Sequence, residues 1–412
     1  LSPADASNVV LDAHDQVNVF LVAGLPAPGG FVSLEGVPDI ETLRSAIRER
    51  LADCGDTTLR RLVQRVRPDR HGFLWETCDV DVNQHVRLTE PVDGQHGLAR
   101  LCAGLMTSPL TIDRPLWEVL VVPGASATAP GVVVRFHHAV SDGTGAVGLL
   151  EQLFGADAEP SPGERPRGRG RRARPSLTRL VSGIRRVASV LRASVPRTVL
   201  LGPISTNRGA AFVDVPLDAA SRGAKAHGGT VNDALLAAVS RAVEDCLVAA
   251  GQPVPATIPA SVPVALPDRS GTGNAVGVMR VALPTGEPDP AVRIARIAAT
   301  TRTAKAEARA QGTFELTRSR LGSRVFAWLA RRQRLVALFV TNVRGPQRPM
   351  SLCGAPLVTA WPLTPIQGNV RLGVSALSYA GRLGCAVHVD ADALDAELLS
   401  RTLRDQLSRI AS

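Results

Sequence analysis

One stretch, VVVRFHHAVSDGTGAVG at residues 132–148, constrains the fold of this chain more than any other. Its first residues are β-branched or aromatic, which predicts a buried strand. Beyond the histidine pair, apolar residues from Ala146 to Phe154 recur at helical spacing. HHAVSDG therefore lies on a predicted strand-to-helix connection, where side chains can reach into a cleft while rigid elements hold their base.

Two adjacent histidines occupy this connection. Successive side chains of a strand point to opposite faces, so His137 and His138 cannot share one space if the strand continues that far. We predict that one is the working imidazole and the other a structural partner. A histidine at a strand end is also often only a hydrogen-bonded core residue, and the residues alone leave that alternative open.

The glycines that follow suggest a different function. Gly143, Gly145 and Gly148 spell GxGxxG between a strand and a helix, as a dinucleotide-binding fold requires. Such a fold also needs a second strand that ends in an acid about twenty residues further on. This chain instead continues into Pro- and Arg-rich sequence after Phe154. We therefore interpret the glycines as turn and close-packing residues.

The composition predicts a globular α/β protein. With 412 residues, 45% of them apolar, and a mean hydropathy of +0.08, the chain can bury a large core and is expected to form two domains. Aromatic residues make up 3%, so stacking platforms for single-stranded nucleic acid are not expected. The six cysteines form no CxxC pair, which indicates reduced thiols in a cytoplasmic protein, without disulfides or a metal site.

The net charge of +10 comes from one block of sequence. Residues 165–197 contain eleven arginines and no acid, so the rest of the chain is close to neutral. A DNA-binding fold would spread its basic residues over a docking face, so no nucleic-acid partner is expected. Residues 164–175 have the composition of a linker, and a basic amphipathic helix is predicted after them. That helix fits either peripheral contact with an anionic membrane or lipid droplet, or ordinary packing with a solvated face.

No signal peptide and no transmembrane helix are expected. Asp5 and Asp12 interrupt the apolar opening of the chain. The uncharged run at residues 352–370 is broken by proline, glycine and polar residues. We expect an N-terminal domain at residues 1–155, the basic linker and helix at 156–200, and a C-terminal domain at 201–412.

The rest of the pattern alternates strands with helices. Asp39 and Asp289 are predicted helix caps, and TVND at residues 230–233 has the S/T-x-x-D/E form of a helix start. A predicted hairpin turns at Ala380 and Gly381. Strands are predicted at 17–25, 31–34, 119–122, 132–136, 212–217, 276–283 and 337–343, the hairpin at 372–389, and helices starting near 40, 96, 146, 231, 291 and 395.

Motifs that are absent narrow the chemistry. The sequence has no GxSxG, no P-loop and no HExxH, so serine-hydrolase, NTPase and zincin chemistry have no local support. What remains is a histidine, His138, with a carboxylate four residues away at Asp142 and no nominated protein nucleophile. This combination suits a general base that activates a hydroxyl, amine or thiol of the substrate.

HHAVSDG matches the HHxxxDG motif of the chloramphenicol-acetyltransferase-like superfamily, and the chain resembles the bacterial wax ester synthase/diacylglycerol acyltransferases within it. Five further stretches are similar to segments of that family: LSPAD at 1–5, PLTIDRPLWE at 109–118, GPI at 202–204, TVND at 230–233 and TNVRGP at 341–346. Leu201, Ser205 and Arg344 depart from the family pattern, which leaves the acceptor and the acyl chain length open.

The resemblance implies two chloramphenicol-acetyltransferase-like domains of mixed sheet and helix that face each other across a channel. Acyl-CoA would enter as co-substrate from one side, and an apolar alcohol such as diacylglycerol or a fatty alcohol from the other, with no further cofactor. It makes His138 the general base and His137 its structural neighbour. Asp142 would hold the loop through a salt bridge, and Gly143 would allow close approach.

For the remaining candidate site residues, more than one role stays open. The oxyanion donor is expected near Thr341 and Asn342, or at a backbone amide near Gly143. Asn232 and Asp233 either only cap a helix or also lie near the channel. Two alternatives stay open beside triacylglycerol or wax ester synthesis: a natural-product alcohol as acceptor, and a catalytically silent lipid-binding relative. The intact histidine motif argues against the silent relative.

Overall fold

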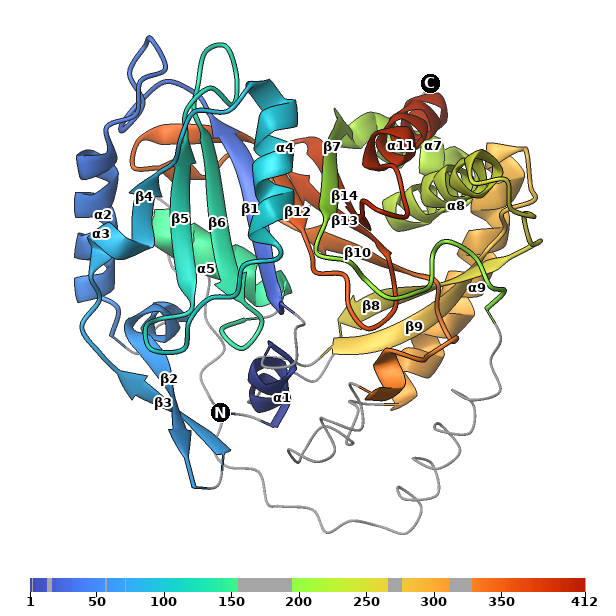
Figure 1. The fold of residues 1–412 in the computed structure, drawn as a ribbon. Coiled ribbons are helices and arrows are strands. Elements are labelled where there is room, and N and C mark those ends of the chain that lie inside the picture. The colour runs from blue at the N-terminus through green and yellow to red at the C-terminus, as the bar shows by residue number, and fades with distance from the viewer. Residues whose placement is uncertain are drawn as a thin grey trace.

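The computed structural model of the chain describes residues 1, 3–12, 17–55, 58–70, 72–141, 143–154, 195–265, 276–311 and 328–411. These residues form two halves that lie side by side, each built on a sheet with helices packed against it (Figure 1). We call residues 1–154 the first half and residues 195–411 the second half. The expected mixture of sheet and helix in both halves is confirmed.

The first half consists of α1 (Pro3–Asp12), β1 (Val19–Pro26), α2 (Ile40–Ala52), the 3₁₀ helix η1 (Thr58–Val63), β2 (Gln64–Asp69), β3 (Gly72–Thr77), α3 (Val82–His85), β4 (Val86–Leu88), α4 (Gly94–Leu105), β5 (Trp117–Val122), β6 (Gly131–His137) and α5 (Gly143–Phe154). Asp39 caps α2 as predicted, because its carboxylate accepts hydrogen bonds from the backbone N–H groups of Glu41 and Thr42.

The second half consists of β7 (Arg208–Pro216), α7 (Leu217–Ala226), α8 (Val231–Ala249), β8 (Ile258–Ala265), β9 (Val276–Leu283), α9 (Pro290–Gln311), β10 (Leu338–Arg344), β11 (Ser351–Leu352), β12 (Ala355–Leu363), β13 (Leu372–Tyr379), β14 (Arg382–Asp390) and α11 (Ala396–Ala411). The predicted hairpin is present as β13 and β14, and its turn residues Ala380 and Gly381 both have positive φ.

Strand β6, which carries the histidine motif, lies in the middle of its sheet. The strand order is β11-β12-β1-β6-β5-β4, and β6 is antiparallel to both of its neighbours. All residues of β6 are buried, because α4 lies on one side of the sheet and α5 on the other (Figure 1). The antiparallel pair β5 and β6 therefore ends in the interior of the molecule at the histidine motif.

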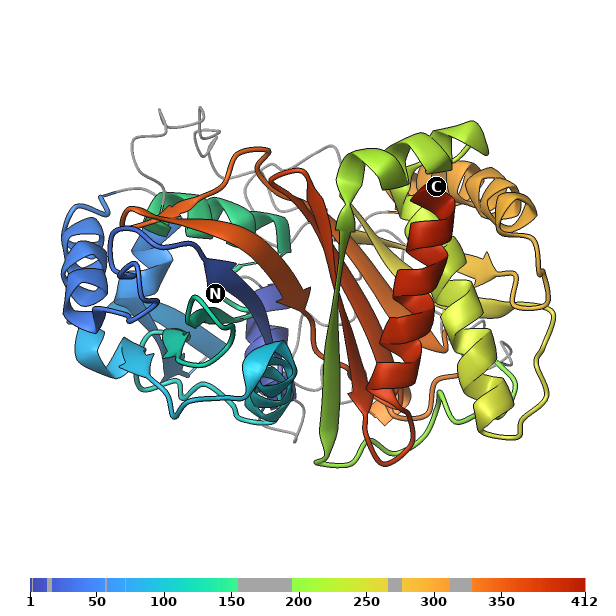
Figure 2. The ribbon, with the colours of Figure 1, turned by 90° about the horizontal axis from the view of Figure 1, so that it is seen from above.

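Two strands of the first sheet come from the second half. β12 pairs with β1, and β11 extends the sheet beyond β12. The sequence did not predict that strands of the second half join the first sheet. Figure 2 shows β12 lying within the first half although its neighbours in sequence belong to the second. The ring of Trp361 on β12 stacks on Phe212 of β7 with centroids 4.9 Å apart. Because β12 belongs to one sheet and contacts the other, it fixes the two halves against each other.

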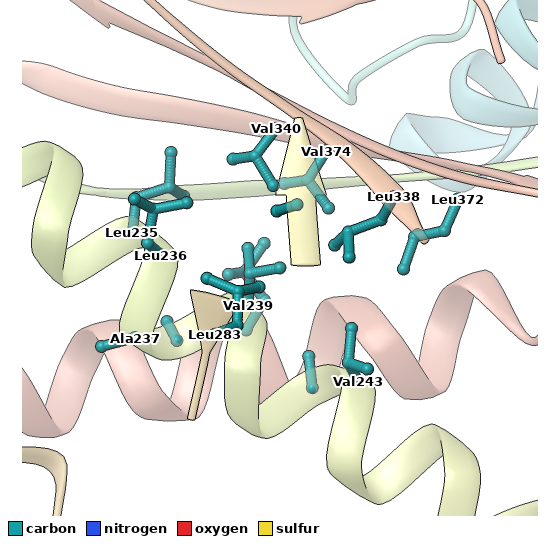
Figure 3. Packing of buried hydrophobic residues seen from close by; sticks show 14 of the residues in the cluster. Leu235, Leu236, Ala237, Val239, Val243, Leu283, Leu338, Val340, Leu372 and Val374 are labelled. Atoms are coloured by element: carbon teal, nitrogen blue, oxygen red, sulfur yellow. The ribbon is translucent and has the colours of Figure 1, made fainter. Parts of the chain in front are cut away.

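The second sheet, in the order β7-β14-β13-β10-β8-β9, carries its helices on the face away from the first half (Figure 2). Leu235 and Val239 of α8 pack with Val340 and Val374 of the sheet in one buried cluster (Figure 3). The other face of this sheet is thereby left to meet the first half.

One predicted strand, residues 31–34, is wrong. These residues form turns with isolated bridges from Val32 to Gly29 and Pro38. Gly30 and Gly36 have φ values of +51° and +77°, and such left-handed residues on both sides turn the chain before a ladder can form.

No helix in the part of the chain that the structure describes is long and apolar enough to cross a membrane. The predicted basic helix falls on residues 155–194, which lie outside the described residues.

Candidate active site

His137 is the last residue of β6, and both of its ring nitrogens have partners within the protein. The backbone N–H of Ala139 donates to Nδ1 at 2.9 Å, so the ring proton is on Nε2. Nε2 lies 3.0 Å from the Asp12 carboxylate and donates to it. The imidazole is 1% exposed. His137 is therefore held in one tautomer and one orientation, as the predicted structural partner would be.

Asp12, at the end of α1, also orders the segment that leads into β1. Its other carboxylate oxygen accepts a short hydrogen bond from the backbone N–H of Asn18. The carbonyl of Asn18 in turn accepts from the backbone N–H of His138 at 2.9 Å. One carboxylate thus fixes the side chain of one histidine directly and the backbone of the other through Asn18.

His138 is the first residue beyond β6 and is only partly buried. Its ring lies beside Phe20 with centroids 4.9 Å apart, and its carbonyl accepts a hydrogen bond from the Asn8 side chain. Burial, and to a smaller extent the neighbouring His137, lower the pKa of His138 to about 4. The imidazole is therefore neutral near pH 7 and able to accept a proton.

Gly143 brings the motif of the first half against the second half. A Cβ atom at this position would lie 3.3 Å from Cγ2 of Val343 on β10, which is a tight contact. Thr341 and Asn342 precede Val343 on the same strand and are partly buried. The segments HHAVSDG and TNVRGP, about two hundred residues apart in the sequence, therefore meet where the halves join.

The other predicted site residues have different surroundings. Asp142 lies outside the described residues. Asp233 forms the predicted capping box with Thr230 at the start of α8, and its second oxygen accepts from Thr301 Oγ1 at 2.7 Å. Asn232 is partly buried on the first turn of the same helix. The structure thus gives Asp233 a complete structural role, on the helix-covered side of the second sheet.

A cleft of about 1280 Å³ runs between the two halves. Asp12 and Met106 line it from the first half, and Arg208, Gln367 and His388 line it from the second. His138 is not among the residues that line this cleft. It is connected to the lining through Asn18, whose backbone carbonyl accepts from the His138 N–H and whose side-chain carbonyl accepts from Gln367 Nε2 at 2.8 Å. We call this space the interdomain cleft.

Asp12, Asn18 and Gln367 were not predicted as site residues. Asp12 is separated from His137 by 125 positions, and no local pattern links them. The one signal in the sequence was that Asp5 and Asp12 interrupt the apolar residues of the opening segment, and this does not single out Asp12. Among the described residues, no group of three or more His, Cys, Asp or Glu side chains could hold a metal ion.

The arrangement defines a class of protein. Two halves, of which the second contributes β11 and β12 to the sheet of the first, with the histidine motif at their junction, form the fold of the chloramphenicol-acetyltransferase-like acyltransferases. The wax ester synthase/diacylglycerol acyltransferase of Marinobacter aquaeolei superposes with a TM-score of 0.72 at 20% identity, over 100% of this chain and 98% of that one. The starter condensation domain of rhizomide synthetase, determined in complex with C8-CoA and Leu-SNAC, superposes with a TM-score of 0.56 at 14% identity, over 100% and 93%.

The sequence comparison gives the particular family. Residues 1–195 match the wax ester synthase/diacylglycerol acyltransferase catalytic domain, and residues 272–411 match the C-terminal domain of the same family. A probable diacylglycerol O-acyltransferase of Mycobacterium tuberculosis, tgs1, is 30% identical over 94% of this chain and 91% of its own length. The chain belongs to the wax ester synthase/diacylglycerol acyltransferase family and is an acyltransferase, which confirms the resemblance seen in its motifs.

Replacing Asp12 tests its place at the centre of the site. Asp12→Ala leaves the ring N–H of His137 and the backbone N–H of Asn18 without their acceptor, and each unsatisfied group costs about 1–3 kcal/mol. We expect the free energy of unfolding in urea to fall by about 2 kcal/mol or more. Asp93→Ala is the control, because the Asp93 side chain makes no capping hydrogen bond to α4. Equal losses for the two variants would contradict the role given to Asp12.

Proposed function

We propose that the protein transfers a fatty acyl group from acyl-CoA to the hydroxyl group of diacylglycerol or of a long-chain alcohol, making triacylglycerol or wax ester. Family membership supports the acyl transfer, and the names of the relatives support these acceptors. The C8-CoA bound to a fold neighbour supports CoA as the carrier. Acyl-CoA is then a co-substrate, and no further cofactor is part of the proposal.

In the proposed reaction His138 acts as the general base. Its neutral imidazole takes the proton of the acceptor hydroxyl while that oxygen attacks the thioester carbon. The tetrahedral intermediate then collapses with cleavage of the carbon–sulfur bond, and the imidazolium returns the proton to the leaving thiolate. The products are an ester and free CoA, and the enzyme carries no covalent acyl group.

The observation that carries this assignment is the difference between the two histidines. His137 has both ring nitrogens engaged, one by Ala139 and the other by Asp12. His138 lies beyond the strand and is partly exposed, and its backbone is hydrogen-bonded to Asn18 and Asn8. Because both ring nitrogens of His137 are taken, the proposal assigns the base to His138, whose imidazole is neutral near pH 7.

We further propose that the oxyanion is stabilised where Gly143 meets β10. The first backbone N–H groups of α5 have no intrahelical partner and form the positive end of the helix dipole. Thr341 and Asn342 offer side-chain donors on the adjoining strand. Asp142 is assigned to holding the loop, and the proposal gives Asn232 and Asp233 no part in the chemistry.

Substitution of His138 tests the base. His138→Ala should lower thiol release from hexadecanoyl-CoA by about a hundredfold or more, since a positioned base contributes at least that much. Diacylglycerol, hexadecanol and water are offered separately, which also identifies the acceptor. His227→Ala, an exposed histidine at the end of α7, is the matched control and should keep full activity. Undiminished activity of the His138 variant would remove the general-base assignment.

The pH profile gives a second test. Protonation of His138 abolishes its function as a base, and its folded-state pKa is lowered to about 4. We expect kcat/KM to stay level as the pH falls from 8 to about 5, and to decrease tenfold per unit below about 4. Circular dichroism at each pH confirms that the protein is folded. An inflection near the ordinary histidine value of about 6.5 would be inconsistent with the desolvation that lowers the pKa of His138.

We also propose peripheral contact with an anionic membrane or lipid-droplet surface through residues 165–197. The eleven arginines and the absence of acids in this segment support it. Deletion of residues 165–194 should reduce co-sedimentation with vesicles of phosphatidylglycerol and phosphatidylcholine, and should leave the weak binding to pure phosphatidylcholine unchanged. Equal binding to anionic vesicles before and after deletion would end the proposal.

A further inference from the structure

His388 lies on β14 in the wall of the interdomain cleft, on the face of the second sheet that looks toward the first half. Its Nδ1 is 2.8 Å from the backbone carbonyl of Thr364. A carbonyl only accepts hydrogen bonds, so the ring proton is on Nδ1 and Nε2 carries a lone pair. The side chain is 1% exposed, and Nε2 has no hydrogen-bond partner within the described part of the chain.

An unpaired ring nitrogen of this kind is costly to bury. Leaving a buried polar atom unsatisfied costs about 1–3 kcal/mol. Desolvation lowers the pKa of His388 to about 4, so the ring stays neutral and Nε2 stays an acceptor. A lone pair repels anionic oxygen atoms. A neutral N–H or O–H donor can complete this hydrogen bond, and an anionic oxygen cannot.

The charged side chains that line the cleft indicate a second property of the ligand, its charge. Arg208, Arg331 and Arg332 line it, and Asp12 is the one acid among its described lining residues. Asp12 already binds His137 and Asn18. Beside the arginines lies Trp328, 55% exposed, with the guanidinium of Arg332 4.6 Å from its ring centroid. This end of the cleft favours a ligand that carries phosphate or carboxylate groups.

Only one of the two proposed substrates has both a neutral N–H or O–H group for His388 Nε2 and anionic groups for the arginines. Diacylglycerol and a fatty alcohol have one hydroxyl group each, which must be at His138 to react, and they carry neither anionic groups nor N–H donors. Acyl-CoA has phosphates at one end, a thioester at the other, and two amide N–H groups in the pantetheine arm between them. The cleft thus fits the thioester donor and not the alcohol.

We infer that His388 binds acyl-CoA, with Nε2 accepting a hydrogen bond from an amide N–H of the pantetheine arm while the phosphates lie toward Arg331 and Arg332. The inference rests on the proposed function, because it assigns one side of that site to the CoA thioester. It gives His388 a role in holding the donor substrate, separate from the proton transfer at His138.

Binding of free CoA, measured by titration calorimetry, tests the inference without any acceptor or chemical step. His388→Phe keeps a ring of similar size and removes the lone pair. The loss of one neutral hydrogen bond, net about 0.5–1.5 kcal/mol, should weaken binding about two- to tenfold. The control is His85→Phe, because His85 is another buried histidine with Nδ1 against a backbone carbonyl and it lies away from the cleft. The control should bind CoA as the wild type does.

A second measurement separates the hydrogen bond from a general change of shape. S-octanoyl-N-acetylcysteamine retains one amide of the pantetheine arm, whereas S-octanoyl ethanethiol has none, and neither carries phosphate. The wild type should prefer the first by a ratio of kcat/KM values that shrinks toward one in His388→Phe. The ratio is internal to each variant, so partial loss of folded protein does not affect it.

The outcomes are distinct. Unchanged CoA binding and an unchanged preference in His388→Phe would overturn the inference while leaving the proposed function intact. A wild-type protein that does not bind CoA would overturn both, because the donor substrate would be of another class. Normal CoA binding together with full activity of His138→Ala would remove the general base and leave the role of His388 standing.

Discussion

The carboxylate of Asp12 is the contact on which the geometry of the site depends. It accepts the ring proton of His137 and the backbone N–H of Asn18, and the Asn18 carbonyl accepts from His138. A single charged group thereby fixes which nitrogen of His137 is protonated and where the next residue leaves the strand. The same contacts therefore order the side chain of one histidine and the backbone of the other.

The site exists only because the two halves are held together. β12 leaves the second half to pair with β1, and Trp361 on that strand stacks on Phe212 of β7. The segment that follows β12 places Gln367 against Asn18. Gly143 is in turn close to Val343, so that motifs from both halves border one space. A division of the chain into two independent units would lose this space, since each half supplies one wall of the cleft.

Much of the secondary structure could be predicted, because the signals are local. The strand before His137, the caps at Asp39 and Thr230, and the hairpin turn at Ala380 each depend on residues within a few positions of one another. The pairing of β12 with the sheet of the first half could not be predicted in this way. Its residues are an uncharged run rich in turn formers, and its pairing with β1 bridges more than three hundred positions. The false strand at residues 31–34 shows the same limit, because backbone turns at Gly30 and Gly36 outweighed the apolar side chains.

The sequence by itself determined the family and the histidine pair, because HHxxxDG and the five accompanying segments are contiguous patterns that need no knowledge of folding. That the His137 imidazole is held in one tautomer was decided by the tertiary structure, through a carboxylate 125 residues away. His388 is a further example, since it has no distinguishing neighbours in the sequence. Its unpaired lone pair arises only when β14 and the segment after β12 bury it beside the cleft. Hydrogen-bond partners and burial depend on spatial neighbours, and those are set by packing of the whole chain.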